Sequence, residues 1–233
     1  MASRPLAAPA PTPSLACSRR AALAAAALVL APAAPVWALA PPRGRIEPLV
    51  PILQGRILLA ELAATASAPP EQRSAVQWSS VLTSLRRSPL ANFRASAREY
   101  QDGLEYSRTL TADDKKLCFA RLDDAACAQS LVSADLDFRG LLINSCLTDI
   151  GAVDDELSYL ARCQQARATG AAPGGGITCA ATDDTDELRD ATNKAAQSFD
   201  AFFDSVGASE IELAMDAVRR RDRVREILPL RDG

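Results

Sequence analysis

The stretch that decides the fold is AACAQSLVSADLDFRGLLINSCLTDIGAVDDELSYLARCQQ, residues 125–165. Apolar side chains recur in it at helical spacing: Val132, Leu136, Ile143, Cys146, Leu147, Ile150, Val153, Leu157 and Leu160. This spacing predicts an amphipathic helix at the centre of the core. Charged residues are expected off the stripe: Asp135, Arg139, Asp149, Asp155 and Arg162. A straight helix of nearly forty residues would span about 60 Å, so we expect a break near Ser133 or Gly151.

Helical patterns also precede this stretch. Residues 52–65 have apolar side chains at helical spacing, after an extended segment over residues 39–51 in which Pro48 and Pro51 oppose a clean helix start. Residues 71–107 are divided by Pro89, which predicts two helices or one kinked helix joined at Ser88-Pro89. A capping box from Thr111 to Asp114 predicts a helix that starts there and continues towards Asp123.

The C-terminal part contains a glycine-rich segment and two further helical regions. Residues 168–181 are expected to form a flexible loop, because Gly170, Pro173 and three successive glycines interrupt any helix. A helix is expected from about Thr182. Asp183, Asp184, Asp186 and Glu187 suit its N-terminus, with a cation site as the alternative. Gly207 can end that helix, and Ser209 can cap a last helix over residues 210–227.

The composition agrees with helices throughout. Aromatic residues make up 5% of the chain and alanine is abundant, which favours closely packed helices over a sheet. We therefore predict an all-α fold, an up-and-down helical bundle similar to a four-helix bundle with extra helices. The bundle domain is expected over residues 52–228 of the 233.

Charge and the absence of histidine exclude several classes of function. The chain has no histidine, which rules out Ser-His-Asp triads, Cys-His dyads and His-containing metal sites. Without Arg4, Arg19 and Arg20 of the leader, 23 basic side chains face 29 acidic ones. This balance argues against nucleic acid as a partner, and no cofactor, metal or small-molecule substrate is expected.

The first 38 residues have the pattern of a cleaved leader. Residues 1–17 are rich in Ala, Pro and Ser and lack acidic residues, and the pair Arg19-Arg20 precedes an apolar run that is too short to span a membrane. Cleavage is expected after Ala38 rather than Ala40, because Pro41 would follow the second site directly. The order of signals resembles the bipartite targeting sequence of thylakoid lumen proteins. A bacterial twin-arginine signal and an ordinary secretory signal are the alternatives.

Five cysteines follow the leader. Cys163 and Cys179 bracket the glycine-rich segment and form the preferred disulfide pair. Cys118 and Cys127 bracket a turn and form the second pair, which leaves Cys146 in the core as a small apolar residue. Crossed pairings stay open, and no Cys-x-x-Cys spacing indicates a redox or zinc site. An oxidising compartment would favour structural disulfides.

Two groups of arginines are candidates for binding an acidic partner. The first lies around the Ser88-Pro89 joint: Arg86, Arg87, Arg94 and Arg98. The second lies near the C-terminus: Arg219, Arg220, Arg221, Arg223 and Arg225. Several arginines together can steer association with an acidic surface, whereas a solvated helix face is the alternative for both groups.

Several short elements resemble the PsbQ and PsbQ-like family of extrinsic photosystem II subunits. Trp78 with Val81, Leu85-Arg86, Phe93-Arg94 and residues 113–116 (Asp-Asp-Lys-Lys) resemble its Trp-x-x-Val, Leu-Arg and acidic-Lys-Lys elements, within residues 46–160. The resemblance implies a non-catalytic bundle that binds the lumenal face of a photosynthetic membrane complex, stabilises it and helps to retain the ions of the water-oxidising site.

Other classes of function stay open. The same features fit an assembly or repair factor, or a lumenal subunit of photosystem I or of the NADH dehydrogenase-like complex. An enzyme would need a pocket with paired perturbed groups, for which Tyr100, Glu99, Asp102 and Glu105 are the candidates on one helix. Carboxylates at helical spacing are more often surface residues, so we expect no enzymatic activity.

Overall fold

The computed structural model describes residues 43–106, 110, 112–118, 123–170, 172, 177–179 and 184–227, apart from the side chains of residues 112, 113 and 222–227. Ala38–Gly233 form one compact unit, and all the helices described below belong to it. The predicted leader and residues 39–42 lie outside the described residues.

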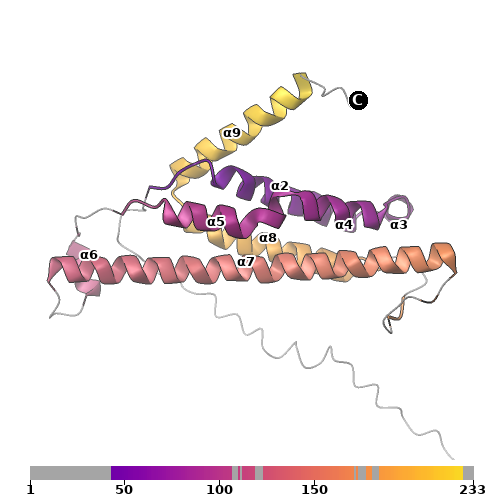
Figure 1. Ribbon diagram of the computed structural model, residues 1–233, viewed down its shortest axis with the longest axis horizontal. Helices are drawn as coiled ribbons and strands as arrows, with labels where there is room; N and C mark the ends of the chain where they lie inside the picture. Colours follow the sequence, from indigo (N-terminus) through magenta and orange to yellow (C-terminus); the bar gives the residue numbers. More distant parts are fainter. Residues whose placement is uncertain are drawn as a thin grey trace, which may run out of the picture. The chain divides into compact units, whose positions relative to one another are not determined.

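In the described part of the chain, four helical arms form the bundle (Figure 1). Their bounds are α2 Leu49–Ala66, then α4 Trp78–Arg87 continued by η1 Pro89–Asn92 and α5 Phe93–Asp102, then α7 Asp124–Thr169, and finally α8 Asp186–Asp204. Each arm packs on two others: α2 packs on α8 and on η1 with α5, and α7 packs on α8 and on α4 with α5. Following the chain through Figure 1, successive arms run in opposite directions. The predicted all-α up-and-down bundle is confirmed.

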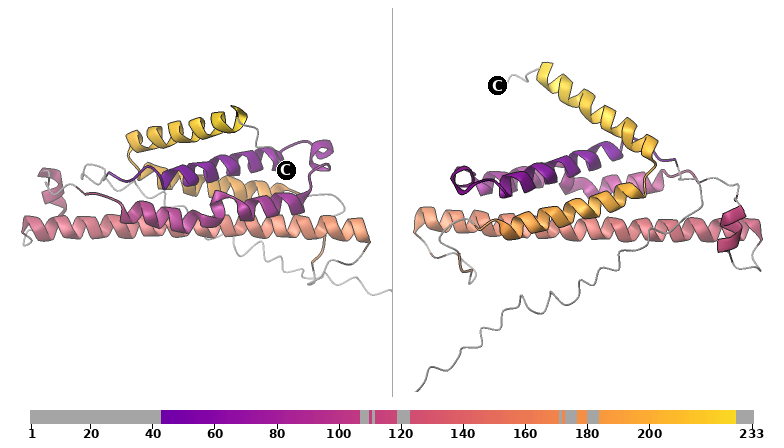
Figure 2. Two further views of the ribbon diagram at one scale, coloured as in Figure 1. Left: turned by 45° about the horizontal axis from the view of Figure 1, so that its top comes forward. Right: turned by 180° about the vertical axis from the view of Figure 1, so that it is seen from behind.

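Shorter or peripheral helices join these arms. Among the described residues they are α3 Pro70–Arg73, α6 Ala112–Leu117 and α9 Ala208–Ile227. α6 lies beside the first turns of α7 in both views of Figure 2 and is linked to it by the Cys118–Cys127 disulfide. α9 packs on α2, and its side chains Ala214 and Val218 are buried.

α7 is one uninterrupted helix of 46 residues. The predicted break near Ser133 or Gly151 is therefore wrong. A glycine inside a helix costs only about 1 kcal/mol, which the packing of α4, α5 and α8 along α7 readily offsets. The helix begins with Asp123, whose side chain accepts a hydrogen bond from the Ala126 N–H (2.8 Å). It ends at Gly170, which has the left-handed φ of 65° typical of a helix C-terminus.

Proline acts differently at its two positions. At Pro89 the helix is divided as predicted: α4 stops and η1 begins, and the Ser88 hydroxyl accepts a hydrogen bond from the Leu90 N–H. Near the N-terminus, α2 starts at Leu49 and includes Pro51, so the predicted extended segment is wrong for residues 49–51. A proline in the first turn loses no intrahelical hydrogen bond, because those N–H groups have no partner in the helix anyway.

Other helix boundaries also differ from the predictions. α6 starts at Ala112, close to the predicted start, but ends at Leu117 instead of continuing towards Asp123. α8 starts at Asp186 rather than near Thr182, and Asp184 accepts a hydrogen bond from the Asp186 N–H. α9 starts at Ala208, which places Ser209 inside the first turn. Of the predicted loop 168–181, α7 takes residues 168 and 169, and residues 171, 173–176, 180 and 181 lie outside the described residues.

Candidate functional site

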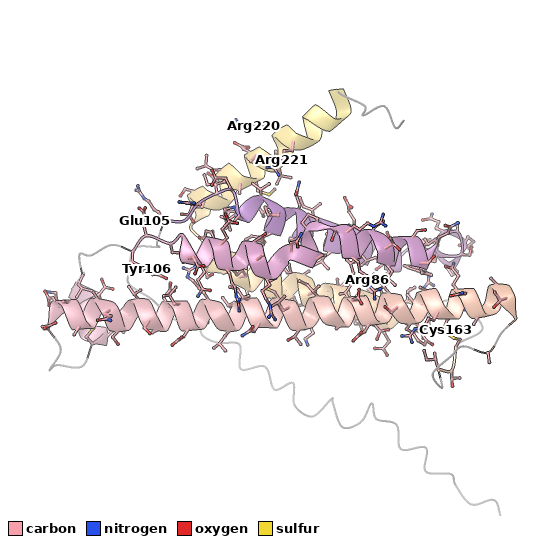
Figure 3. All side chains as sticks on the ribbon, viewed as in Figure 1. Arg86, Glu105, Tyr106, Cys163, Arg220 and Arg221 are labelled. Atoms are coloured by element: carbon pink, nitrogen blue, oxygen red, sulfur yellow. A yellow bond between two sulfur atoms is a disulfide. The ribbon has the colours of Figure 1, made fainter. Side chains whose placement is uncertain are left out.

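The predicted partner-binding arginines lie on three helices. Arg86 and Arg87 end α4, Arg94 and Arg98 lie on α5, and Arg219, Arg220, Arg221 and Arg223 lie on α9. The first seven are exposed, and the side chain of Arg223 is outside the described part. Arg219 forms an ion pair with Asp216 one turn earlier (3.5 Å). Figure 3 shows Arg86 between α4 and α7, and Arg220 and Arg221 on α9.

Arg86 and Arg98, two of the arginines around Pro89, line different pockets. Arg86 lies on a groove whose α7 wall includes Ser158, whereas Arg98 lies on a second pocket of about 520 Å³ whose α7 wall includes Leu136. These two α7 positions are separated by about 33 Å at 1.5 Å per residue. A docking surface therefore has to be sought around one of these arginines, not across the whole group.

The Arg86 guanidinium is held in a defined geometry. Its Nε and one terminal nitrogen each donate to a different carboxylate oxygen of Asp154, at 2.8 Å, and the same terminal nitrogen donates to the Ser158 hydroxyl at 3.1 Å. Hydrogen bonding to Arg86 lowers the pKa of Asp154, which stays ionised. The two-point contact fixes the plane of the guanidinium although the side chain is 57% exposed.

The groove between α4 and α7 has a volume of about 850 Å³. Its lining is polar with a small apolar floor: Gln77, Ser79, Leu82, Arg86, Ser158, Ala161, Arg162, Gln164, Gln165 and Ala168. None of these lining residues is acidic. Arg162 was expected off the apolar stripe of α7, and it is exposed here. Its part in a groove could not be inferred without knowing which helix packs beside it.

A buried polar network lies at the α5 end of the bundle. Asp135 and Arg139 form an ion pair at 2.7 Å, with side chains 10% and 4% exposed. The Tyr106 hydroxyl donates to the same Asp135 oxygen (2.6 Å), and Arg139 donates to the Ser205 hydroxyl (3.2 Å). These contacts connect α7 to the segment after α5 and to the end of α8.

A second buried polar cluster is centred on Glu210. Its carboxylate accepts hydrogen bonds from the Tyr100 hydroxyl (2.8 Å) and from the Gly44 N–H (2.5 Å). A side chain at position 44 would collide with the Tyr100 ring, so this close approach requires glycine. Glu210 thereby joins the start of α9 to α5 and to the residues before α2.

The prediction that Asp135, Arg139 and Asp149 lie off the buried stripe is wrong. All three are buried: Asp135 and Arg139 pair with each other, and Asp149 binds Lys194 (3.0 Å) and the Ser198 hydroxyl. Burial is tolerated because each charge has a partner. A signal was present in the sequence, since Leu131, Asp135, Arg139 and Ile143 follow one another at four-residue steps.

Two tyrosines and one cysteine are held in their neutral forms. Burial, followed by hydrogen bonding to Glu210 and to Asp135 respectively, raises the pKa of Tyr100 and of Tyr106 well above the usual tyrosine range. Burial also raises the pKa of the Cys146 thiol to about 12. The prediction of Cys146 as a small apolar core residue is confirmed. A protonated, enclosed thiol is a poor nucleophile.

The two predicted disulfides are present. Cys163 is joined to Cys179, and Cys118 to Cys127. The first fastens Ile177–Cys179 to the C-terminal part of α7, where the Tyr159 hydroxyl also donates to the Thr178 carbonyl (3.1 Å). Cys163 is labelled in Figure 3.

The acidic residues form no metal site within the described part of the chain. Asp186 and Glu187 lie in the first turn of α8, as predicted for a helix N-terminus. Burial and the neighbouring carboxylates, Glu187 first among them, raise the pKa of Glu156 on α7. No group of three His, Cys, Asp or Glu side chains in the described residues is placed to hold a metal ion. Glu99, Asp102 and Glu105 are exposed, away from the buried hydroxyl of Tyr100.

α2 is long and apolar enough to cross a membrane by length and composition alone. In the structure it is instead a core helix, with eight buried residues facing its neighbours.

These observations define a disulfide-linked all-α bundle with an arginine-lined groove. No protein-family model, curated protein or solved structure matches the chain.

Proposed function

We propose that this protein is a non-catalytic subunit of the thylakoid lumen that docks on a photosynthetic membrane complex and stabilises it, with photosystem II on its oxygen-evolving side as the preferred partner. The observation that carries the proposal is the leader. A segment without acidic residues precedes Arg19-Arg20, a short apolar run and a small-residue cleavage site. The two disulfides agree with export to an oxidising compartment.

The buried groups favour docking over catalysis. A catalytic site needs reactive groups that a substrate can reach. The groups with strongly raised pKa values are the hydroxyls of Tyr100 and Tyr106 and the thiol of Cys146, and each lies inside the bundle or hydrogen bonds to a carboxylate. Their contacts connect helices to one another, which is what a rigid binding module requires.

The charge distribution supports an electrostatic mode of docking. The chain beyond the leader is net acidic, yet the described arginines of the candidate surfaces are exposed on α4, α5 and α9. Local basic surfaces on an acidic protein can orient it towards an acidic partner. We expect washing with concentrated salt to release the protein from thylakoid membranes, whereas retention at high salt would count against this mode.

The decisive experiment is affinity purification from mildly solubilised thylakoids, combined with import into isolated chloroplasts. Import should deliver a shortened protein to the lumen, and purification should recover photosystem II core subunits. Recovery of photosystem I or NADH dehydrogenase-like subunits would identify another complex, and recovery of assembly intermediates alone would identify an assembly or repair factor. A protein that stays in the stroma, or a lumenal monomer without a partner, would refute the proposal.

A further inference from the structure

We propose that the groove between α4 and α7 is the docking site for an extended acidic segment of the partner protein, whose carboxylates bind Arg86 and Arg162. This inference rests on the proposed function, because it names the surface and the chemistry by which the protein would dock.

Two arginines of the groove both donate hydrogen bonds to Ser158. Arg86 donates to the Ser158 hydroxyl (3.1 Å), and Nε of Arg162 donates to the Ser158 carbonyl (3.1 Å). Asp154 neutralises Arg86, and no acidic side chain within the described residues forms an ion pair with Arg162. These three side chains together carry a net charge of one positive unit. The guanidinium nitrogens of Arg162 can therefore donate hydrogen bonds to a carboxylate of the partner.

The rest of the lining suits a polypeptide better than a compact charged ion. Gln77 and Gln165 supply amide donors and acceptors that can bind backbone groups, while Leu82 and Ala161 supply apolar area. The volume of about 850 Å³ lies in the range of ligand sites, and exposed residues line it along both helices. The absence of acidic lining residues makes the groove complementary to an acidic occupant.

The walls of the groove are fixed in position before any partner binds. The Gln164 amide on α7 donates to the Val76 carbonyl (2.8 Å), and its oxygen accepts from the Trp78 N–H (3.0 Å). This double contact fastens the start of α4 to α7, and the Arg86–Asp154 pair fastens its end. A preformed site loses less conformational entropy on binding, which favours affinity.

The groove can be tested with a pair of variants that differ only in position. Ser79 and Ser80 are both exposed in the first turn of α4, but only Ser79 lines the groove. A glutamate suits the first turn of a helix, so neither Ser79→Glu nor Ser80→Glu should disturb the fold. Both variants leave Arg86, Asp154 and Arg162 intact and add the same charge.

The binding experiment uses the full chain and a fluorescein-labelled peptide of alternating glycine and glutamate, with the glycine–glutamine peptide as the uncharged probe. Fluorescence anisotropy at low salt should show binding of the glutamate peptide only. We expect Ser79→Glu to weaken that binding about tenfold and Ser80→Glu to change it less than about twofold. Equal losses in the two variants, or no binding by the wild-type protein at about 1 mM, would overturn the proposal.

Two further measurements separate other occupants and the wider function. Binding to vesicles of anionic lipid that Ser79→Glu abolishes, without binding of the peptide, would assign the groove to a membrane surface and refute a peptide site. Concentration-dependent dimerisation lost in Ser79→Glu would assign it to a second copy of the chain.

In the purification from thylakoids, wild-type and Ser79→Glu proteins that recover the complex equally would refute the groove but not the proposed function. A wild-type protein that recovers no complex would refute the function, while the peptide assay still reports on the groove.

Discussion

Two Arg–Asp pairs, whose aspartates both lie on α7, place the same chemistry in opposite surroundings. Asp135 and Arg139, in the N-terminal half of α7, are 10% and 4% exposed and also bind Tyr106 and Ser205. Asp154, in the C-terminal half, binds Arg86, and their side chains are 30% and 57% exposed. Burial decides the role of each pair. The first pair is enclosed and connects helices, whereas the second orients a guanidinium at the edge of a groove.

Removing one charge from the buried pair should have the largest effect on the stability of the protein. In Asp135→Asn the Arg139 guanidinium would stay buried without its counter-ion, and the Tyr106 hydroxyl would lose an ionised acceptor. We expect the free energy of unfolding to fall by about 3–5 kcal/mol, measured by urea denaturation. Asp137→Asn is the control, because Asp137 is exposed on the same helix. Equal, small losses in both variants would show that the buried pair contributes no more than a surface charge.

Removing the Cys163–Cys179 disulfide tests whether the end of the groove depends on this covalent link. It closes a separation of 16 residues. Replacing both cysteines by serine should lower the free energy of unfolding by about 3 kcal/mol, mainly because the unfolded chain gains freedom. If the groove is fixed by Gln164 and Asp154, as the contacts indicate, the double serine variant should bind the glutamate peptide about as tightly as the wild-type protein does. A large loss of peptide binding in that variant would show that the Cys163–Cys179 disulfide helps to hold the groove in shape.

Particular residues show how far the sequence alone can predict this structure. The apolar spacing from Ile143 to Leu160 and the break at Pro89 predicted the helices, because both are local properties. The bracketing of the glycine-rich segment also predicted the Cys163–Cys179 pair. Local patterns do not report which helices become neighbours. The Glu210–Tyr100 contact joins residues 110 positions apart, and the groove exists only because α4 packs on α7.

The burial of Asp135 and Arg139 was not predicted because both side chains are charged. Their four-residue spacing continues the buried positions Leu131 and Ile143, but a charged residue is ordinarily exposed unless it finds a partner inside. That partner was the other member of the pair, one helical turn away. Reading the period and the opposite charges together would have predicted a buried ion pair at this place.

Alkaline pH should weaken the buried network while it leaves the groove intact. In the unfolded chain, tyrosine hydroxyls ionise at about pH 10. The pKa values of Tyr100 and Tyr106 are raised in the folded protein, so there the two hydroxyls stay protonated at higher pH. Stability from this effect is full below about pH 10 and is lost as pH rises towards the folded-state values, by up to about 1.4 kcal/mol per pH unit for each tyrosine. Urea midpoints between pH 8 and 11 measure it, and Tyr100→Phe should reduce the slope. An unchanged slope in that variant would contradict the assignment.

The smallest effect on folding is expected from the exposed pair. Asp154→Asn removes the carboxylate that orients Arg86, and exposed ion pairs contribute little to stability, least at high salt. Because Arg86 lowers the pKa of Asp154, this small contribution is present above about pH 4 and is lost as pH falls below it.

Peptide binding in the groove should respond to Asp154→Asn in the opposite sense. Without Asp154 the groove carries a second unbalanced positive charge, so the glutamate peptide should bind more tightly while stability hardly changes. A variant that loses stability as Asp135→Asn does, or that binds the peptide more weakly, would show that Asp154 is needed to hold Arg86 in place, and that the exposed pair is structural as well.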